Sequence, residues 1–210
     1  MRVCDWICSG VADAIQAHDT VATRSQDAFS EKLERPQAKI LQARFNRLEN
    51  VTATENFQYR TASAHTADLV LNSSDGNQIV CEIKAMYKTW FKRNGRPYPA
   101  YLWSPFENPS KEHSAANDLW KLSVLAPPDA THIAQIILGS SLPVDAMAKD
   151  LDKYAGLAHI SSDPWQAARV AFDNCHHRGY EYDIRVWCCP REDVATWQPK
   201  VAKFFASSRL

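Results

Sequence analysis

Residues 65–84, HTADLVLNSSDGNQIVCEIK, constrain the fold of this chain more than any other stretch. Two short apolar runs flank a polar segment that contains Asp75-Gly76, a dipeptide typical of tight hairpin turns. The first run carries one carboxylate, and the second ends in a Glu-x-Lys triplet. We therefore predict two antiparallel strands joined by a tight turn, with charged side chains near their far ends.

The length of the loop decides which side chains share a face, because a shift of one residue moves every side chain to the other face. A two-residue loop would pair Leu69 with Glu82 and separate Asp68 from Glu82. A three-residue loop with Gly76 in the left-handed conformation would pair Asp68 with Glu82. We predict the second register, because it leaves one face almost wholly apolar and suited to packing under a helix: Leu69, Leu71, Ile79, Cys81, Ile83 and Ala85.

In this register two carboxylates, Asp68 and Glu82, converge with the ammonium group of Lys84. Such a cluster is costly to bury without partners. A hard divalent cation resolves this, because Mg²⁺ takes oxygen ligands and suits one or two carboxylates plus a phosphate oxygen. Lys84 could orient an attacking water or stabilise developing negative charge. We therefore predict a Mg²⁺ site, with Mn²⁺ as a substitute.

Asp68, the thirteen residues that follow it, and Glu82-Ile83-Lys84 together resemble the motif of the PD-(D/E)xK nuclease superfamily, which has the restriction-endonuclease-like fold. The resemblance implies that Asp68 and Glu82 bind the metal together with the Ile83 carbonyl, and that Lys84 serves the hydrolytic water. Ala67 stands where the name-giving proline would be, at a position that is loose in the family.

The opening helix of that fold often supplies a further carboxylate to the metal. Glu31, Glu34 and Glu49 are the candidates in this chain, and we prefer Glu34 or Glu31 because they lie farther upstream of the hairpin. A solvated surface charge is the alternative interpretation of each glutamate.

The remaining pattern predicts one α/β domain over residues 1–210: a mixed sheet flanked by helices. Its restriction-endonuclease-like core (helix, three-stranded meander, helix, strand) spans about residues 31–138, and residues 139–210 form a variable C-terminal part. Around the hairpin we predict a helical or irregular lead-in at 1–20, helical segments at 21–33, 36–49, 113–125, 144–157, 164–175 and 192–205, and strands at 57–61, 132–138 and 183–189.

The helix at 113–125 places Asp118 and Lys121 one turn apart. This pair resembles the Asp-x-x-Lys-Leu helix that many nuclease-like proteins carry after the Glu-x-Lys strand. We interpret it as an i,i+3 ion pair worth a few tenths of a kcal/mol, in preference to a catalytic role.

Basic residues alternate with aromatic residues in 87–112, a segment without a regular period. Long irregular segments in compact domains are often functional, and this composition suits a phosphate backbone and unstacked bases. We predict nucleic-acid contacts from Lys88, Lys92, Arg93 and Arg96. The alternative is a proline-rich loop whose aromatic side chains pack onto the core.

Composition narrows the remaining choices. With 24 basic and 24 acidic residues the net charge is zero, so any attraction to nucleic acid must be local. We see no apolar run of membrane length and no secretory pattern, and therefore expect a soluble cytoplasmic protein. The six cysteines lack the density of a disulfide scaffold and the spacing of a zinc site, so we expect them to be reduced and mostly buried.

The function that these features favour is Mg²⁺-dependent hydrolysis of phosphodiester bonds in DNA. A homodimer would suit double-strand cutting, although no sequence feature demonstrates one. A catalytically inactive nuclease-like fold that binds nucleic acid or protein is the first alternative. An unrelated α+β enzyme whose hairpin matches the motif by chance is the second.

Overall fold

The structure is a computed structural model that describes residues 3–21, 34–59, 65–88, 90–93, 96–99, 115–141, 165–171 and 181–193. Its helices are α1 (Val3–Val21), α2 (Glu34–Phe45), α4 (Ala115–Leu125) and the short 3-10 helix η3 (Arg191–Asp193). Its strands are β1 (Val51–Gln58), β2 (Thr66–Ser73), β3 (Gln78–Lys88), β4 (Trp90–Arg93), β5 (Arg96–Pro99), β6 (His132–Ser141), β7 (Trp165–Ala171) and β8 (Glu181–Pro190).

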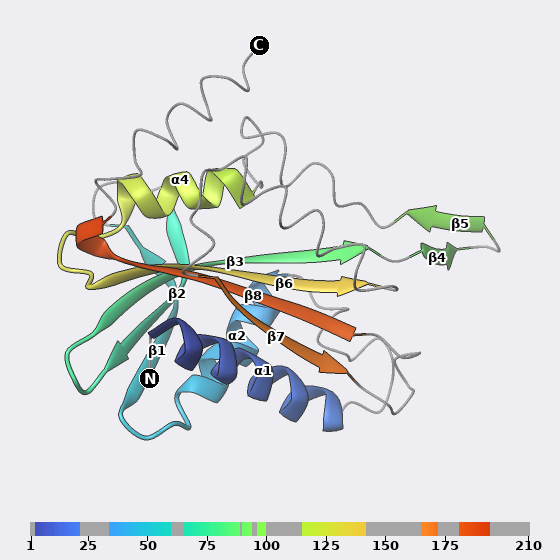
Figure 1. The fold of residues 1–210 in the computed structure, drawn as a ribbon, viewed down its shortest axis with the longest axis horizontal. Helices are drawn as coiled ribbons and strands as arrows, with labels where there is room; N and C mark the ends of the chain where they lie inside the picture. The colour runs from blue at the N-terminus through green and yellow to red at the C-terminus, as the bar shows by residue number, and fades with distance from the viewer. Residues whose placement is uncertain are drawn as a thin grey trace, which may run out of the picture.

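Six strands form one mixed sheet in the order β1-β2-β3-β6-β8-β7. The first three strands are an antiparallel meander, and β6 then pairs parallel to β3 after the chain has passed through α4. Strands β8 and β7 continue the sheet in antiparallel pairs. The hairpin β4–β5 extends beyond the end of β3 as a separate two-stranded sheet (Figure 1). The predicted α/β class with a mixed sheet and flanking helices is confirmed.

Helices cover both faces of the sheet (Figure 1). Helix α4 lies on one face, where it packs on β3 and β6, and α1 and α2 lie on the other. Each face has its own apolar core because the strands alternate their side chains between the two. Beneath α4 this core includes Val70, Val80, Leu119, Leu122 and Ile133. Beneath α1 and α2 it includes Ile7, Val11, Leu41, Phe45, Leu69, Leu71 and Ile83.

The predicted hairpin register is confirmed. Strand pairing runs from Leu69 opposite Cys81 to Asn72 opposite Gln78. The Ser73 amide donates to the Asn77 carbonyl at 2.9 Å, so three residues form the loop. Gly76 has φ 88°, a left-handed conformation that glycine adopts without a steric penalty. The apolar face of the hairpin packs under α1 and α2, as predicted.

In β1 and β2 the alternation of side chains between the two faces of the sheet is reversed near the candidate site. Ala53 packs under α1 and α2, whereas Tyr59, which has the same parity on the chain, packs under α4. Regular alternation would put both side chains on one face, and the residue between them that breaks it is Asn56, with φ 51°. Ala67 and Leu69 in β2 differ in the same way. The reversal therefore turns Tyr59 toward the α4 face, and Asp68 lies at the crossing point.

Several predicted elements need correction. Residues 165–171 form the strand β7 and not a helix, because pairing with β8 outweighs the helix preference of this alanine-rich segment. The first strand begins at Val51, six residues earlier than predicted, since its many polar side chains suit an edge strand. Helix α2 ends at Phe45, where turns replace the predicted last helical residues. The segment 87–112, predicted to be irregular, contains the end of β3 and the hairpin β4–β5.

The other predicted elements are confirmed or lie outside the described residues. The helices at 1–20 and 113–125 and the strands at 132–138 and 183–189 are present with shifted ends. The predicted helices at 21–33 and 144–157 lie outside the described residues, as does 192–205 beyond η3. Four cysteines, Cys8, Cys81, Cys188 and Cys189, are buried as predicted. Among the helices that the structure describes, none is long and apolar enough to span a membrane.

Candidate active site

Glu82 of β3 is the centre of a buried polar cluster on the α4 face. Its side chain is 1% exposed. The Tyr59 hydroxyl donates a hydrogen bond to Glu82 Oε1 at 2.7 Å, and Lys121 Nζ donates one to Oε2 at 2.9 Å. Both carboxylate oxygens are therefore bound, one from the end of β1 and one from α4.

Asp118 of α4 joins two lysines to this cluster. Its Oδ1 lies 3.0 Å from Lys121 Nζ, and its Oδ2 lies 3.0 Å from Lys84 Nζ. Asp118 and Lys84 are 3% and 4% exposed, so these charges depend on one another for solvation. Lys121 thus bridges Asp118 and Glu82, while Lys84 is held by Asp118.

Asp68 completes the cluster from β2. Its Oδ2 accepts a hydrogen bond of 2.7 Å from the Ile83 amide, and Ile83 follows Glu82 directly in β3. The amide and carbonyl of one strand residue point toward the same neighbouring strand, so the Ile83 carbonyl faces the side of β3 on which Asp68 lies. Asp68 is half-buried and closer to solvent than Glu82.

Burial and neighbouring charges raise the pKa values of these carboxyl groups. Burial raises the pKa of Asp68, with a smaller contribution from Asp118, against the opposing effects of the Ile83 amide and Lys121. Burial and the neighbouring Asp68 raise the pKa of Glu82 well above its usual range. The environment therefore disfavours the ionised forms of both groups in the absence of a cation.

The pKa values of the Lys121 ammonium group and the Tyr59 hydroxyl are raised as well, and for these two groups the shift favours the protonated donor. Burial lowers the pKa of Lys121, but Glu82 and Asp118 outweigh it and the pKa lies above its ordinary value. Burial, followed by Glu82, raises the pKa of the Tyr59 hydroxyl, so Tyr59 remains a hydrogen-bond donor. We name Asp68, Glu82, Lys84, Asp118 and Lys121 the charged cluster. It contains three carboxyl and two ammonium groups, so full ionisation leaves one excess negative charge.

The oxygen atoms that β2 and β3 bring together suit a hard cation. Asp68, Glu82 and the Ile83 carbonyl present oxygen ligands only, the set that Mg²⁺ prefers. Asp118 Oδ2 is buried and lies 3.0 Å from Lys84 Nζ, so this ion pair already occupies it. Within the described residues, no three or more His, Cys, Asp and Glu side chains form a metal-holding group, so the fit rests on two carboxylates and a carbonyl.

The structure brings together the three residues that the motif singled out, Asp68, Glu82 and Lys84. It adds Asp118 and Lys121 to them. Their predicted ion pair exists, but it also contacts Glu82 and Lys84 and is part of the cluster. The sequence signal was the Asp-x-x-Lys spacing on the buried face of an amphipathic helix.

Glu49 is the one weaker candidate whose side chain the structure describes. Glu31 and the side chains of Glu34, Lys88, Lys92, Arg93 and Arg96 lie outside the part of the chain whose side chains the structure describes. Glu49 lines a different pocket, at the turn end of the hairpin.

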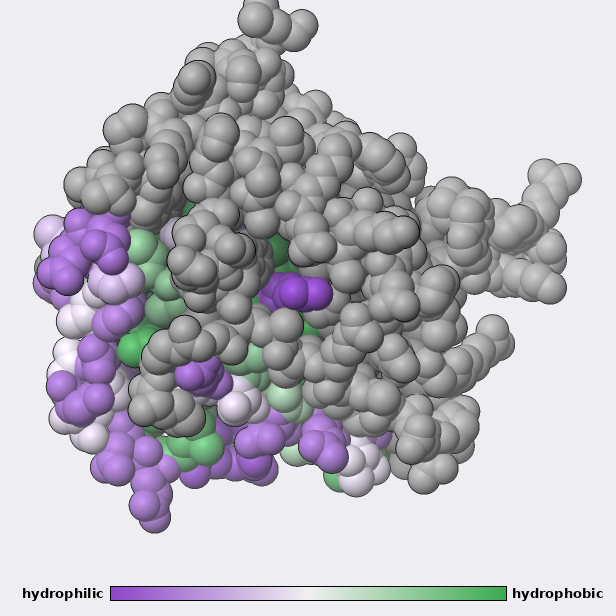
Figure 2. Space-filling model, in the orientation of Figure 1, coloured by the Kyte–Doolittle hydropathy of each residue, from purple (hydrophilic) through white to green (hydrophobic). Residues whose placement is uncertain are grey.

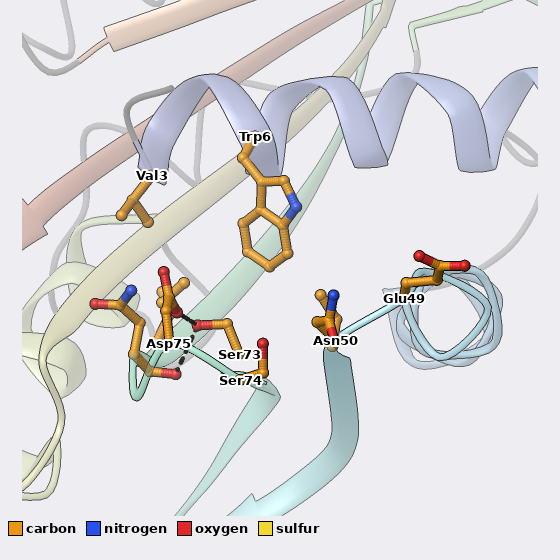
Figure 3. Close-up of a pocket in the computed structure, with 10 residues that line it drawn as sticks. Val3, Trp6, Glu49, Asn50, Ser73, Ser74 and Asp75 are labelled. Atoms are coloured by element: carbon orange, nitrogen blue, oxygen red, sulfur yellow. Dashed lines mark hydrogen bonds between the residues drawn. The ribbon is translucent and has the colours of Figure 1, made fainter.

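That pocket has a volume of about 280 Å³ and lies between the start of α1, the β2–β3 turn and the α2–β1 connection (Figure 3). The Trp6 indole points from α1 toward the turn, where Ser73 and Asp75 hydrogen-bond each other. Hydrophilic side chains gather at the same end of the molecule in Figure 2. The polar residues of this pocket are mostly exposed turn residues, so the charged cluster is the stronger candidate site.

Comparison of this chain with protein-family models, with curated proteins and with solved structures found no match.

Proposed function

We propose that this protein is a Mg²⁺-dependent nuclease that hydrolyses phosphodiester bonds in DNA. The observation that carries the proposal is the meeting of Asp68 and Glu82 on neighbouring strands, with Asp68 bound to the Ile83 amide. Adjacent carboxylates repel each other and so lower the stability of the fold. They are, however, the ligands that a hard divalent cation requires.

The topology supports the proposal. A helix, an antiparallel meander of three strands, a second helix and a strand parallel to the third follow in the order α2-β1-β2-β3-α4-β6, with the hairpin β4–β5 inserted between β3 and α4. This is the element order of the restriction-endonuclease-like core, with Asp68 on the second strand and Glu82 and Lys84 on the third.

The roles of the residues follow from their contacts. Asp68, Glu82 and the Ile83 carbonyl would hold the Mg²⁺, which when bound would polarise the scissile phosphate and lower the pKa of a coordinated water. Lys84 stabilises the attacking hydroxide or the extra negative charge of the transition state. Asp118 is a positioning residue for Lys84, because its Oδ2 lies 3.0 Å from the ammonium group and both side chains are buried. Tyr59 fixes the orientation of Glu82.

A binding module with a nuclease-like fold is the second candidate. The observation that favours it is that both Glu82 oxygens already have partners, Tyr59 and Lys121. In that case the charged cluster is a structural network, and the protein binds its partner without cleaving it.

The test is cleavage of single- and double-stranded DNA in Mg²⁺ or Mn²⁺ by the wild type and by Lys84→Ala. We expect metal-dependent cutting that EDTA abolishes, and a loss of at least about 100-fold in the variant, the effect typical of removing one charge-stabilising group. Lys39→Ala is the matched control, because Lys39 is an exposed lysine 3.9 Å from Glu55 on the opposite face of the sheet.

Each result separates the candidates. Equal cutting by the wild type and a folded Lys84→Ala variant would assign the activity to another site or to a contaminant. DNA binding without cleavage in either metal would favour the binding module.

A further inference from the structure

Lys121 binds Glu82 at Oε2, and it is the more exposed of the two hydrogen-bond donors to Glu82 that the structure describes. Its ammonium group lies 2.9 Å from Glu82 Oε2 and 3.0 Å from Asp118 Oδ1. The Lys121 side chain is 15% exposed, whereas Glu82 and Tyr59 are each 1% exposed. A cation that takes Oε2 as a ligand must therefore displace the Lys121 ammonium group from it.

The two hydrogen-bond donors to Glu82, Tyr59 and Lys121, differ in how easily they can move away from its carboxylate. Tyr59 is packed in the apolar core beneath α4, so moving its ring would disrupt that core. Lys121 ends a flexible four-carbon side chain and has a second partner, Asp118, one helical turn away. Release of Oε2 would cost Lys121 one of its two ion pairs and leave the other in place.

We propose that Lys121 is an internal cation that neutralises Glu82 in the metal-free protein and exchanges with the divalent metal. The inference rests on the proposed function, since the metal is the one held by Asp68, Glu82 and the Ile83 carbonyl. When the metal binds Glu82 Oε2, Lys121 stays on Asp118. The affinity of the site for metal is therefore set by competition with an ammonium group of the same chain.

The charge balance supports the exchange. The charged cluster carries one excess negative charge when fully ionised, and a divalent cation turns this into one excess positive charge. A site with that balance suits a phosphodiester anion. Before the metal binds, Lys121 keeps Glu82 from being a buried charge without a partner, a state that is strongly destabilising.

The experiment is a calorimetric titration of Mn²⁺ into the protein without DNA. We compare the wild type, Lys121→Met and Lys39→Met, an exposed lysine whose removal changes the net charge equally. Lys121→Met should bind Mn²⁺ more tightly by about tenfold or more, because it removes a competing cation from a desolvated carboxylate. Lys39→Met should bind like the wild type. Asp68→Asn in the Lys121→Met background should remove the gain.

A second measurement needs no variant and covers the case in which Lys121→Met does not fold. In a crystal of the wild type soaked in Mn²⁺, the distance from Lys121 Nζ to Glu82 Oε2 should lengthen from 2.9 Å beyond hydrogen-bond range. The distance to Asp118 Oδ1 should stay near 3.0 Å.

The outcomes distinguish the inference from the proposed function. Asp68-dependent Mn²⁺ binding that is equal or weaker in Lys121→Met overturns the inference and leaves the metal site intact. The same holds for a metal seated on Asp68 and Glu82 while Lys121 keeps its bond to Oε2. Folded wild type and Lys121→Met that both bind no metal overturn the inference and the Mg²⁺ site together.

Discussion

At the scale of one residue, Asp68 carries a carboxyl group in surroundings that disfavour its ionised form. Its carboxyl group caps the Ile83 amide, which stabilises the ionised form. Burial, with a smaller contribution from Asp118, acts against ionisation and prevails, so the pKa in the folded protein lies above the unfolded value. The folded protein therefore binds the Asp68 proton more tightly than the unfolded chain does.

This sign predicts a stabilising substitution. Because the folded pKa of Asp68 is raised, the free energy of unfolding falls as pH rises from the unfolded pKa, about 3.9, through the folded value. Asparagine imitates the protonated form at every pH. In metal-free buffer Asp68→Asn should raise the free energy of unfolding at pH 8 by about 0.5–2 kcal/mol, a typical gain when a functional charge is removed. Urea unfolding at several pH values measures it, and the gain should shrink toward pH 4.

Asp75→Asn is the control with the opposite sign. A hydrogen bond from Ser73, together with Asn77, lowers the pKa of this exposed carboxyl group. Its contribution to stability is present above the unfolded pKa and is lost on acidification. Asp75→Asn removes the same charge, yet it should not stabilise the protein at pH 8. If both variants shift stability alike, net charge explains the result and the local environment of Asp68 does not.

Among the elements, the meander β1-β2-β3 decides which side chains reach the cluster. Between Ala53 and Tyr59 the first strand exchanges its faces, and Asn56 lies within this span in a left-handed conformation with φ 51°. Asparagine tolerates this conformation, whereas β-branched residues do not. Without the reversal, Tyr59 would face α1 and α2 and could not donate its hydrogen bond to Glu82.

Asn56→Val should therefore lower the free energy of unfolding by about 1–3 kcal/mol, the cost of a left-handed conformation at a β-branched residue. It should also reduce metal-dependent cleavage, because it disturbs the strand that carries Tyr59. Thermal unfolding and cleavage assays measure the two effects. Asn56→Gly should be close to the wild type in cleavage.

Thr54→Val is the matched control, because Thr54 is an exposed residue of the same strand, paired with Val70 of β2 in a regular ladder. It should leave stability nearly unchanged. A cost for Thr54→Val similar to that for Asn56→Val would point to a general sensitivity of this edge strand.

The hairpin shows how far local chemistry can predict such elements. Asp75-Gly76 and the separation of polar from apolar residues predicted the register that strand pairing confirms. The two charged groups of α4 were visible as an Asp-x-x-Lys pair, but the period of one helix could not tell that Glu82 and Lys84 lie opposite. That arrangement depends on the parallel pairing of β3, which precedes the helix in the chain, with β6, which follows it.

Two other features could not be predicted from the sequence, for physical reasons. Residues 165–171 have the composition of a helix, and their strand conformation depends on β8, which follows later in the chain. Tyr59 would lie on the α1 and α2 face in a regular strand, and a single left-handed asparagine moves it to the site. In both cases the deciding interaction is not local to the segment.

On the scale of the whole molecule, the proposed DNA binding requires a local basic surface, because the net charge of the chain is zero. The hairpin β4–β5 extends from the end of β3, the strand that carries Glu82 and Lys84 (Figure 1). Its sequence contains Lys92, Arg93 and Arg96. We expect this hairpin to contact the phosphate backbone next to the scissile bond.

Replacing Lys92, Arg93 and Arg96 by serine should then weaken DNA binding and reduce its salt dependence. For duplex DNA, the slope of log affinity against log salt should fall by about 0.9 for each phosphate that the variant no longer neutralises, so three such phosphates predict a change of about 2.7. Fluorescence anisotropy at several salt concentrations measures the slope. The Lys84→Ala background keeps the DNA intact during the titration.

The control removes three positive charges elsewhere, at Arg35, Lys39 and Arg47, which are exposed residues on or next to α2. Helix α2 covers the face of the sheet opposite α4 and the charged cluster (Figure 1). The control should lower affinity slightly through net charge and leave the slope within about 0.5 of the starting value, since the same phosphates remain neutralised. Equal changes in slope for both triple variants would mean that DNA binding depends on total charge, and would remove the β4–β5 hairpin from the proposed interface.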